Sequence, residues 1–341
     1  MDPRTVCSVM KDKPWKRLSL AIVLVAFLPI SSPALAEWYG DARPKMGTEV
    51  SVYLWQEDAA AGAAAVESVF AEMDRINALM STYVEDSAIS DVNNRAADGW
   101  VTVDAELFRL ILRSLDVSVL TRGAFDITYD SVGQHYDFRE RQRPDEQTIA
   151  DSLEQIDYQL VETDDRQSAV RFSAPGVRIN LGGIAKGYAV ERGVQILREQ
   201  GVHYARVTAG GDTRLLGSRL DQPWVIGIRD PEAEGAVRIR LPLEDEAIST
   251  SGDYERFFIE DGRRYHHILQ PATGEPAEGV RSATVFGPDA VITDALSTSV
   301  FVMGVDQGLK LIATLPDYEG IVIDAEGQLF YSDGLAAPSP D

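Results

Sequence analysis

The chain has 341 residues and a formal net charge of −22 at pH 7, because its 54 acidic side chains outnumber its 32 basic ones. So negative a protein is a poor candidate for nonspecific binding of nucleic acid or of an anionic membrane surface. With a single cysteine, Cys7, the chain has no internal disulfide framework, and its length is ample for a large hydrophobic core.

The first 36 residues have the composition of an export signal. A basic stretch at 11–17 precedes an apolar run at 18–30, and the small-residue motif Ala34-Leu35-Ala36 follows. The apolar run is shorter than the roughly 20 residues that a membrane helix needs. We expect cleavage after Ala36 and a single domain at 37–341 in a bacterial periplasm. Retention of the segment as an inner-membrane anchor is the alternative.

Helices and strands alternate in the first half of the chain. Alternating polar and apolar residues predict a strand at 49–55, and apolar residues at helical spacing predict a long helix at 59–80. Asp104 begins a second predicted helix, which Gly123 closes. The charged stretch 137–155 is expected to be a solvated loop entering a surface helix.

A glycine-rich turn lies near the middle of the chain. Its sequence is Gly182-Gly183-Ile184-Ala185-Lys186-Gly187. It follows an apolar segment at 179–181, predicted to be a buried strand, and precedes a helical pattern that ends at Gly201. Free N–H groups at a helix start suit an anion such as phosphate, which Lys186 could also reach. The alternative is an ordinary strand-to-helix turn with a surface lysine. The spacing is not that of a P-loop.

The second half of the chain has the pattern of short paired strands. They are predicted at 158–161, 169–172, 203–208, 224–228, 238–243, 247–250 and 283–287. Asp261-Gly262 is a strong hairpin signal between strands at 254–260 and 264–269, and a turn is expected at 251–253. Thr293 is a good N-cap for a helix that runs to Gly304. Hairpin pairs with long helices between them favour an α+β fold.

Four short motifs occur in series along the chain. They are Gly182-Gly183-Ile184-Ala185-Lys186-Gly187, Ala209-Gly210-Gly211-Asp212, Thr250-Ser251-Gly252-Asp253-Tyr254 and Thr293-Asp294-Ala295-Leu296-Ser297-Thr298. Together they resemble the FAD:protein FMN transferase (ApbE) family over about residues 46–304. The resemblance implies an α+β fold of mixed, largely antiparallel sheets with helices, T-fold-like, with a flavin cleft between subdomains.

Spacing alone places Asp294 and Thr298 one helical turn apart on the same face. A carboxylate and hydroxyl oxygens form a reasonable partial shell for Mg²⁺, although Asp also favours a helix start for electrostatic reasons alone. The resemblance implies that Asp294 and Thr298 hold Mg²⁺, with Ser297 beside them and the carbonyl of Gly183 completing the set.

The resemblance further implies which residues bind flavin and which react. The flavin-binding positions are Met46, Tyr83, Ala124, Phe125, Asp126, Asn180, Lys186 and Ile268. The catalytic positions are His267, Asp294 and Lys186, where Lys186 adds a cation near the pyrophosphate. His267 and Asp294 are competing choices for the base that takes the hydroxyl proton.

The activity implied is Mg²⁺-dependent transfer of the FMN moiety of FAD to a Thr or Ser hydroxyl, with release of AMP. The acceptor would be an exported redox protein with an Asp/Ser-Gly-Ala/Ser-Thr segment. Two alternatives are an FAD pyrophosphatase that gives FMN and AMP, and a non-catalytic periplasmic FAD-binding protein. The chain departs from the family pattern at His266, which replaces a serine, and at Gln270, which replaces an aspartate. Neither change removes an implied metal ligand, so we expect activity to be retained, with an altered flavin affinity or target choice.

Overall fold

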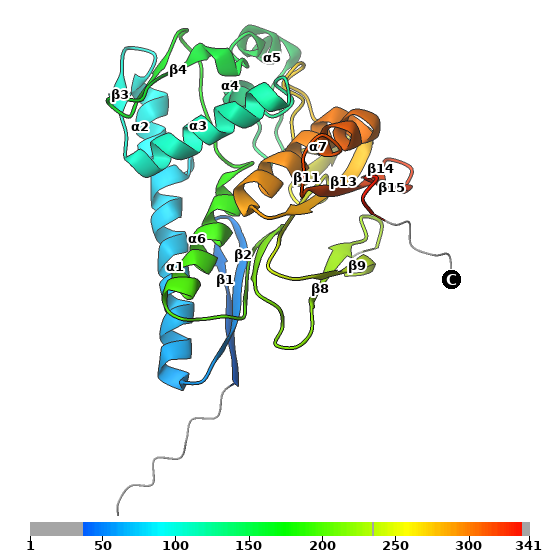
Figure 1. Cartoon of the computed structure of the whole chain (residues 1–341). Helices are drawn as coiled ribbons and strands as arrows, with labels where there is room; N and C mark the ends of the chain where they lie inside the picture. Colours follow the sequence, from blue (N-terminus) through cyan, green and yellow to red (C-terminus); the bar gives the residue numbers. More distant parts are fainter. Residues whose placement is uncertain (1–36, 234, 336–341) are drawn as a thin grey trace, which may run out of the picture. The chain divides into compact units, whose positions relative to one another are not determined.

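The computed structural model describes residues 37–233 and 235–335, shown in Figure 1. The predicted export signal lies outside the described residues, so it stays a prediction, as does the single domain. The helices are α1 (Ala59–Met80), α2 (Ala88–Arg95), α3 (Ala105–Leu120), α4 (Asp130–Gly133), α5 (Glu146–Leu153), α6 (Ala185–Glu199) and α7 (Ala290–Ile312). Short 3₁₀ helices occur at Ile127–Tyr129 and Tyr158–Leu160.

The strands form one large sheet and three small ones. They are β1 (Glu37–Lys45), β2 (Thr48–Gln56), β3 (Val101–Thr102), β4 (Val161–Asp164), β5 (Ala169–Phe172), β6 (Ala205–Ala209), β7 (Asp212–Leu216), β8 (Trp224–Arg229), β9 (Val237–Leu243), β10 (Ala247–Gly252), β11 (Phe257–Glu260), β12 (Arg263–His266), β13 (Val280–Gly287), β14 (Glu319–Asp324) and β15 (Leu329–Tyr331). The large sheet has the order β1-β2-β6-β7-β10-β13-β14-β15, and all its neighbours are antiparallel. Among the described residues the expected α+β fold with antiparallel sheets is therefore confirmed.

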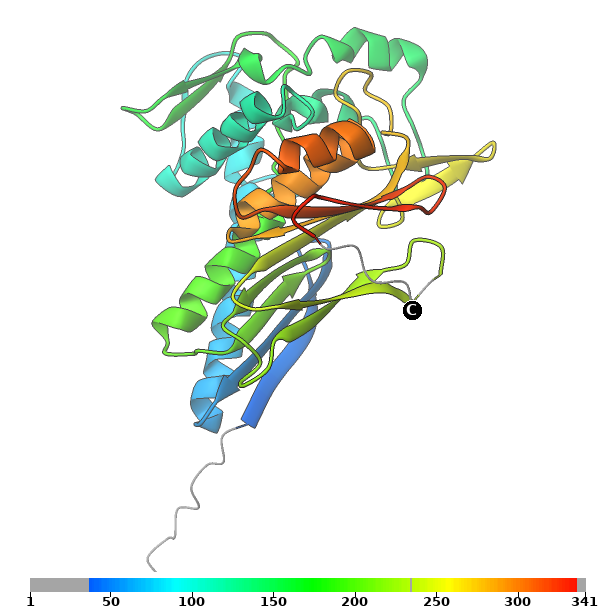
Figure 2. The same cartoon turned by 45° about the vertical axis from the view of Figure 1, so that its right-hand side comes forward.

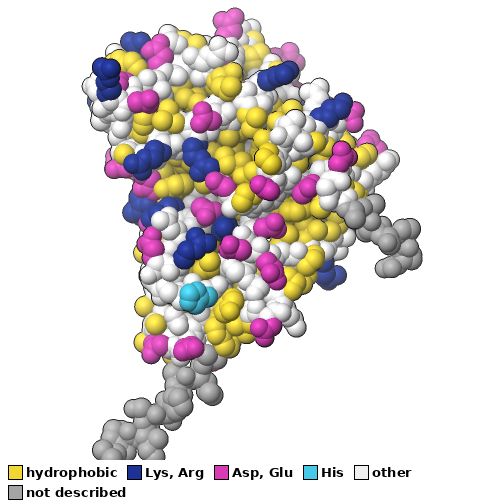
Figure 3. Space-filling view, in the orientation of Figure 1, with side chains coloured by type: hydrophobic (Ala, Val, Ile, Leu, Met, Phe, Trp, Pro, Cys, Tyr) yellow, Lys and Arg dark blue, Asp and Glu magenta, His cyan; other side chains and the backbone are white. Residues whose placement is uncertain are grey.

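The two faces of the large sheet are covered differently. Helices α1 and α6 lie along one face, as Figure 2 shows in light blue and green beside the strands. Successive side chains of a strand alternate between the faces. Val285 of β13 accordingly packs with α7, whereas the next residue, Phe286, packs with the β8–β9 hairpin on the other face. Acidic and basic side chains are interspersed on the surface in Figure 3.

Elements with strong local signals form where the sequence predicts them. Helix α1 covers 59–80, and α3 begins after its N-cap Asp104, whose side chain accepts a hydrogen bond from the N–H of Glu106. Asp261 and Gly262 have φ of 49° and 81° in the turn between β11 and β12, as a two-residue hairpin turn requires. Within residues 37–233 and 235–335 we find no helix with the length and hydropathy of a membrane span.

The predicted strand at 179–181 is wrong, because side chains rather than a neighbouring strand satisfy its backbone. Asn93 bonds both the N–H and the carbonyl of Ile179, through its Oδ1 at 2.8 Å and its Nδ2 at 2.9 Å. The N–H of Asn180 donates to the carbonyl of Ile127. Ile179 and Leu181 are fully buried, but the segment belongs to no sheet.

The predicted N-cap of the last helix is also wrong. Asp289 caps α7, and its Oδ1 accepts from the N–H groups of Val291 and Ile292. Thr293 lies inside the helix, fully buried, and its hydroxyl hydrogen-bonds Ser249. The helix is interrupted at Gly304, where the prediction ends it, and then continues to Ile312. In addition, 251–252 continue β10 rather than form a turn, and α2 has no counterpart among the predicted elements.

Candidate active site

A pocket of about 480 Å³ lies where the end of α1, the start of α6 and the strand β10 meet. Its lining includes residues of the first motif of the series, the glycine-rich turn, and of the last motif, which contains Asp294 and Thr298. The predicted site residues that line it are Met46, Tyr83, Ala124, Phe125, Asp126, Asn180, Gly183, Lys186, His267, Ile268, Asp294 and Thr298. Ser297 does not line it. The structure thus gathers residues that are up to 252 positions apart (298 − 46) in the sequence into one cavity.

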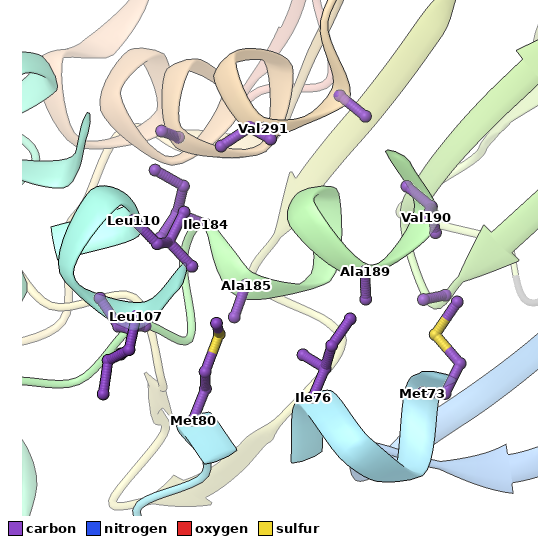
Figure 4. Packing of buried hydrophobic residues seen from close by; sticks show 14 of the residues in the cluster. Met73, Ile76, Met80, Leu107, Leu110, Ile184, Ala185, Ala189, Val190 and Val291 are labelled. Atoms are coloured by element: carbon purple, nitrogen blue, oxygen red, sulfur yellow. The ribbon is translucent and has the colours of Figure 1, made fainter. Parts of the chain in front are cut away.

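The start of α6 is fixed by packing. Figure 4 shows Met80 and Ile76 of α1 pointing toward Ala185 and Ala189 of α6. Ile184, just before the helix, is fully buried in the same core. Because close-packed side chains resist displacement, this packing holds the start of α6 in place at the pocket wall.

Asp294 of α7 caps α6 from outside. Ile184, the N-cap residue of α6, makes no side-chain capping bond. Instead Oδ2 of Asp294 accepts a 2.8 Å hydrogen bond from the N–H of Gly187, in the first turn of α6. A Cβ at Gly187 would lie 2.1 Å from the carbonyl oxygen of Ala290, so only glycine allows this approach of the two helices. Asp294 is therefore held in one place, with its Oδ1 left toward Lys186.

Lys186 lies between two buried carboxylates. Its Nζ is 2.6 Å from Oδ2 of Asp212 and 3.5 Å from Oδ1 of Asp294. Burial opposes the ammonium charge, but the two carboxylates outweigh it and raise the pKa of Lys186. Burial, together with the charge of Asp212, raises the pKa of the Asp294 carboxyl. The charge of Asp294 is therefore less fully neutralised by Lys186 than the charge of Asp212 is.

The oxygens around Asp294 suit a hard cation. The Oγ1 of Thr298 lies one turn along α7, and a Cβ placed on Gly183 would be 3.4 Å from it. In the described part of the chain there is no group of three or more His, Cys, Asp or Glu side chains arranged as a metal site. One carboxylate, one hydroxyl and a carbonyl nevertheless fit Mg²⁺, which takes oxygen ligands and usually keeps waters or substrate phosphates as the rest.

Ser297 lies behind the wall of the pocket. It is fully buried, its hydroxyl donates to the carbonyl of Asp294 at 2.9 Å, and it hydrogen-bonds Ser251 at 2.8 Å. Ser251 lines the pocket and is also 3.2 Å from Oγ1 of Thr298. Ser297 therefore contacts the residues that form the site rather than the cavity itself.

His267 presents a polar atom without a partner. Its Nδ1 is buried and has no hydrogen-bond partner among the described residues. Burial, and then the positive charge of Arg256, lower the pKa of His267 to about 3, so its imidazole is neutral at pH 7. The adjacent His266 is engaged elsewhere, with Nε2 2.9 Å from the carbonyl of Ala277 and Nδ1 accepting from the N–H of Ile268. Only His267 of this pair faces the pocket.

Two of the predicted flavin-binding residues sit at the edge of the pocket. The side chain of Tyr83 is 85% exposed, which is unusual for so large a ring and leaves one face open for stacking. Met46 has φ of 52° in the two-residue turn between β1 and β2, and this turn places it on the pocket wall.

Two others are engaged in holding the loops. The carboxylate of Asp126 accepts from Thr128 and from the N–H of Tyr158. The Oδ1 of Asn180 accepts from the N–H of Gly182 at 2.8 Å, and its Nδ2 donates to Asp130. Both side chains shape the pocket through the backbone they support.

The profile of the ApbE family matches residues 46–322. The chain belongs to the ApbE family. It is 29% identical to the FAD:protein FMN transferase of Treponema pallidum over 94% of both chains. It is 31% identical to that of Vibrio cholerae, over 79% of this chain and 82% of the relative.

Solved structures of ApbE proteins share the fold. The ApbE protein of Thermotoga maritima superposes with a TM-score of 0.81 at 35% identity, covering 87% of this chain and 98% of the other. The flavin transferase ApbE of Vibrio cholerae gives 0.78 at 27% identity over the same shares. This chain is thus an enzyme of a transferase family.

The sequence did not point to three residues that line this ApbE pocket or support its lining. Asp212 and Ser251 belong to the second and third motifs of the series, but only the fold shows that they contact Lys186 and Thr298, respectively. Arg256 lines the pocket, forms no ion pair with other described residues, and donates to the carbonyl of Gly47 at 3.2 Å. Its position two residues after the Thr250–Tyr254 motif was the available signal.

Proposed function

We propose that this chain transfers the FMN moiety of FAD to a Thr or Ser hydroxyl of a second protein and releases AMP. One observation carries the proposal: a single pocket joins a helix start and two cationic side chains to a neutral imidazole with an unpartnered nitrogen. The helix start and cations suit a pyrophosphate, and the imidazole suits a hydroxyl proton. FAD is also the donor in the names of the relatives.

The pocket offers separate surfaces for the two parts of FAD. Exposed Tyr83 and the apolar side chains of Met46 and Phe125 provide contacts for the flavin ring. Lys186 and Arg256 provide positive charge for the pyrophosphate.

Asp294 and Thr298, with the carbonyl of Gly183, would hold Mg²⁺. Bound there, Mg²⁺ supplies charge neutralisation for the pyrophosphate oxygens. Ser297 and Ser251 would orient these ligands, since they hydrogen-bond the carbonyl of Asp294 and the hydroxyl of Thr298.

His267 is the better of the two candidate bases. Asp294 is the proposed metal ligand and its Oδ2 already accepts from the N–H of Gly187, whereas Nδ1 of His267 has no partner in the described structure. In the reaction the acceptor oxygen bonds to the phosphorus of the FMN half as its proton passes to the imidazole. The bond from that phosphorus to the bridging oxygen breaks, and AMP leaves with this oxygen. A bound pyrophosphate would make the imidazole more basic through its negative charge.

The acceptor we propose is an exported redox protein with an Asp/Ser-Gly-Ala/Ser-Thr segment. The protein itself would act in the periplasm after cleavage behind Ala36, with association with the inner membrane as the alternative. N-terminal sequencing of protein from its native host tests this. We expect a start at Glu37, and an intact N-terminus in a membrane fraction would contradict cleavage.

The function is tested by flavin labelling of an acceptor peptide, followed by fluorescence on a denaturing gel across a Mg²⁺ titration. Asp294→Asn keeps the shape but removes the charge, so labelling should fall by roughly a hundredfold or more. Asp306→Asn is the matched control, because Asp306 is an exposed aspartate on the same helix.

Two results would count against the proposal. Near wild-type labelling by Asp294→Asn at low Mg²⁺ would contradict the metal ligand, and labelling by the wild type without any Mg²⁺ dependence would contradict the mechanism.

A further inference from the structure

Asp212 is a buried carboxylate whose single charged partner, among the described residues, is Lys186. It is 2% exposed and belongs to β7, which is hydrogen-bonded to β6 on one side and to β10 on the other. Its backbone pairs with Ala209 and with Ser249, so the sheet fixes its position. The proposed metal and flavin ligands do not include it, and its side chain does not line the pocket.

The ammonium of Lys186 lies within reach of two carboxylates and can pair with either one. It lies 2.6 Å from Asp212 and 3.5 Å from Asp294, on a side chain with four rotatable bonds. A buried ammonium requires a carboxylate partner, because desolvation of an unpaired charge is costly. Without Asp212, the nearest carboxylate left to Lys186 is Asp294.

We propose that Asp212 is a positioning residue: it retains the Lys186 ammonium and so leaves Oδ1 of Asp294 available to a divalent cation. The inference rests on the proposed function in taking Asp294 as the metal ligand. Two cations cannot share one carboxylate oxygen at contact distance without strong repulsion. By pairing with Lys186, Asp212 prevents the ammonium from competing with the divalent cation for Oδ1 of Asp294. The same pairing keeps Lys186 next to the site, where it can contact the pyrophosphate.

The charges of the three groups agree with this division of roles. Asp212, Lys186 and Asp294 together carry one net negative charge when all are ionised. Asp212 neutralises Lys186, and the charge that remains belongs to Asp294. The uncompensated carboxylate is therefore the one on the pocket wall, next to Thr298.

A double-mutant cycle tests the inference with Mn²⁺ as the probe, without FAD or acceptor. Mn²⁺ binding to the folded chain is measured by electron paramagnetic resonance for the wild type, Asp212→Asn, Lys186→Met and the double variant. Asp212→Asn should weaken Mn²⁺ binding by about tenfold, a coupling typical of charged neighbours, because Lys186 then pairs with Asp294. In the Lys186→Met background the same change should cost only about twofold, since no ammonium competes.

The cycle separates positioning from simple attraction. An equal loss in both backgrounds would show that Asp212 acts through its own negative charge, and an unchanged affinity of Asp212→Asn would show that it has no role. Either result overturns the inference. Asp212→Glu keeps the carboxylate and should retain most of the Mn²⁺ affinity. If Asp212→Glu and Asp212→Asn have the same melting temperature, a role of Asp212 in folding alone predicts the same Mn²⁺ affinity for both variants.

Failure of the proposed function is distinguishable from failure of this inference. A wild-type chain that binds no Mn²⁺ would overturn the inference together with the metal assignment. Retention of FAD in equilibrium dialysis would then still support the flavin site.

Discussion

At the scale of single residues, His267 is the group whose burial has the clearest consequence for pH dependence. Its pKa is lowered to about 3 in the folded protein, against 6.5 for a free histidine. As the pH falls from 6.5 toward 3, the unfolded chain binds a proton that the folded chain cannot, so the free energy of unfolding decreases. The stabilisation by neutral His267 is therefore complete above pH 6.5 and is lost below it.

The change His267→Gln removes this titration. Between pH 7.5 and pH 5 the free energy of unfolding of the wild type should fall by about 2 kcal/mol more than that of the variant. The reason is that pH 5 lies about 1.5 units below the ordinary histidine pKa, and each unit corresponds to about 1.4 kcal/mol. Urea unfolding at the two pH values measures the difference. His203→Gln is the control, because His203 is exposed. The same pH dependence in wild type and His267→Gln would contradict a buried, neutral imidazole.

At the scale of elements, the contact of α6 with α7 builds the site. A Cβ at Gly187 would lie 2.1 Å from the carbonyl oxygen of Ala290 and 2.7 Å from Cβ of Asp294. Gly187→Ala should therefore push the helices apart, weaken the bond from Asp294 to α6, and destabilise the protein by about 3 kcal/mol. Thermal unfolding measures this loss. Gly99→Ala is the control, because a Cβ there meets no atom within 4 Å. Equal melting temperatures of the two variants would contradict the prediction, because they would show that α6 and α7 can move apart without loss of stability.

The elements show which features a sequence can predict. Helix α1 and the β11–β12 turn depend on neighbours along the chain, so their residues reveal them. The segment at 179–181 does not, because its backbone partners are the side chain of Asn93 and the carbonyl of Ile127. Asp289 rather than Thr293 caps α7 because Thr293 is instead bonded to Ser249 across the core.

At the scale of the whole molecule, the site draws on residues from Met46 to Thr298. The site residues that the motif series and its family resemblance predict line the pocket, with the exception of Ser297. The motif series does not predict that Asp212 pairs with Lys186 or that Ser297 lies behind the wall, because those contacts depend on the sheet and on helix packing. The residues that line the pocket can thus be predicted from the sequence, while the contacts that support them cannot.

The central claim, transfer of FMN to a protein hydroxyl, is tested most directly by identifying the products. The protein is incubated with FAD, Mg²⁺ and an acceptor carrying the proposed segment. The denatured acceptor is then analysed by mass spectrometry and the small molecules by chromatography. We predict an acceptor that carries one FMN group on a Thr or Ser, and AMP in equal amount. Free FMN and AMP beside an unlabelled acceptor, or FAD that remains intact, would contradict the account.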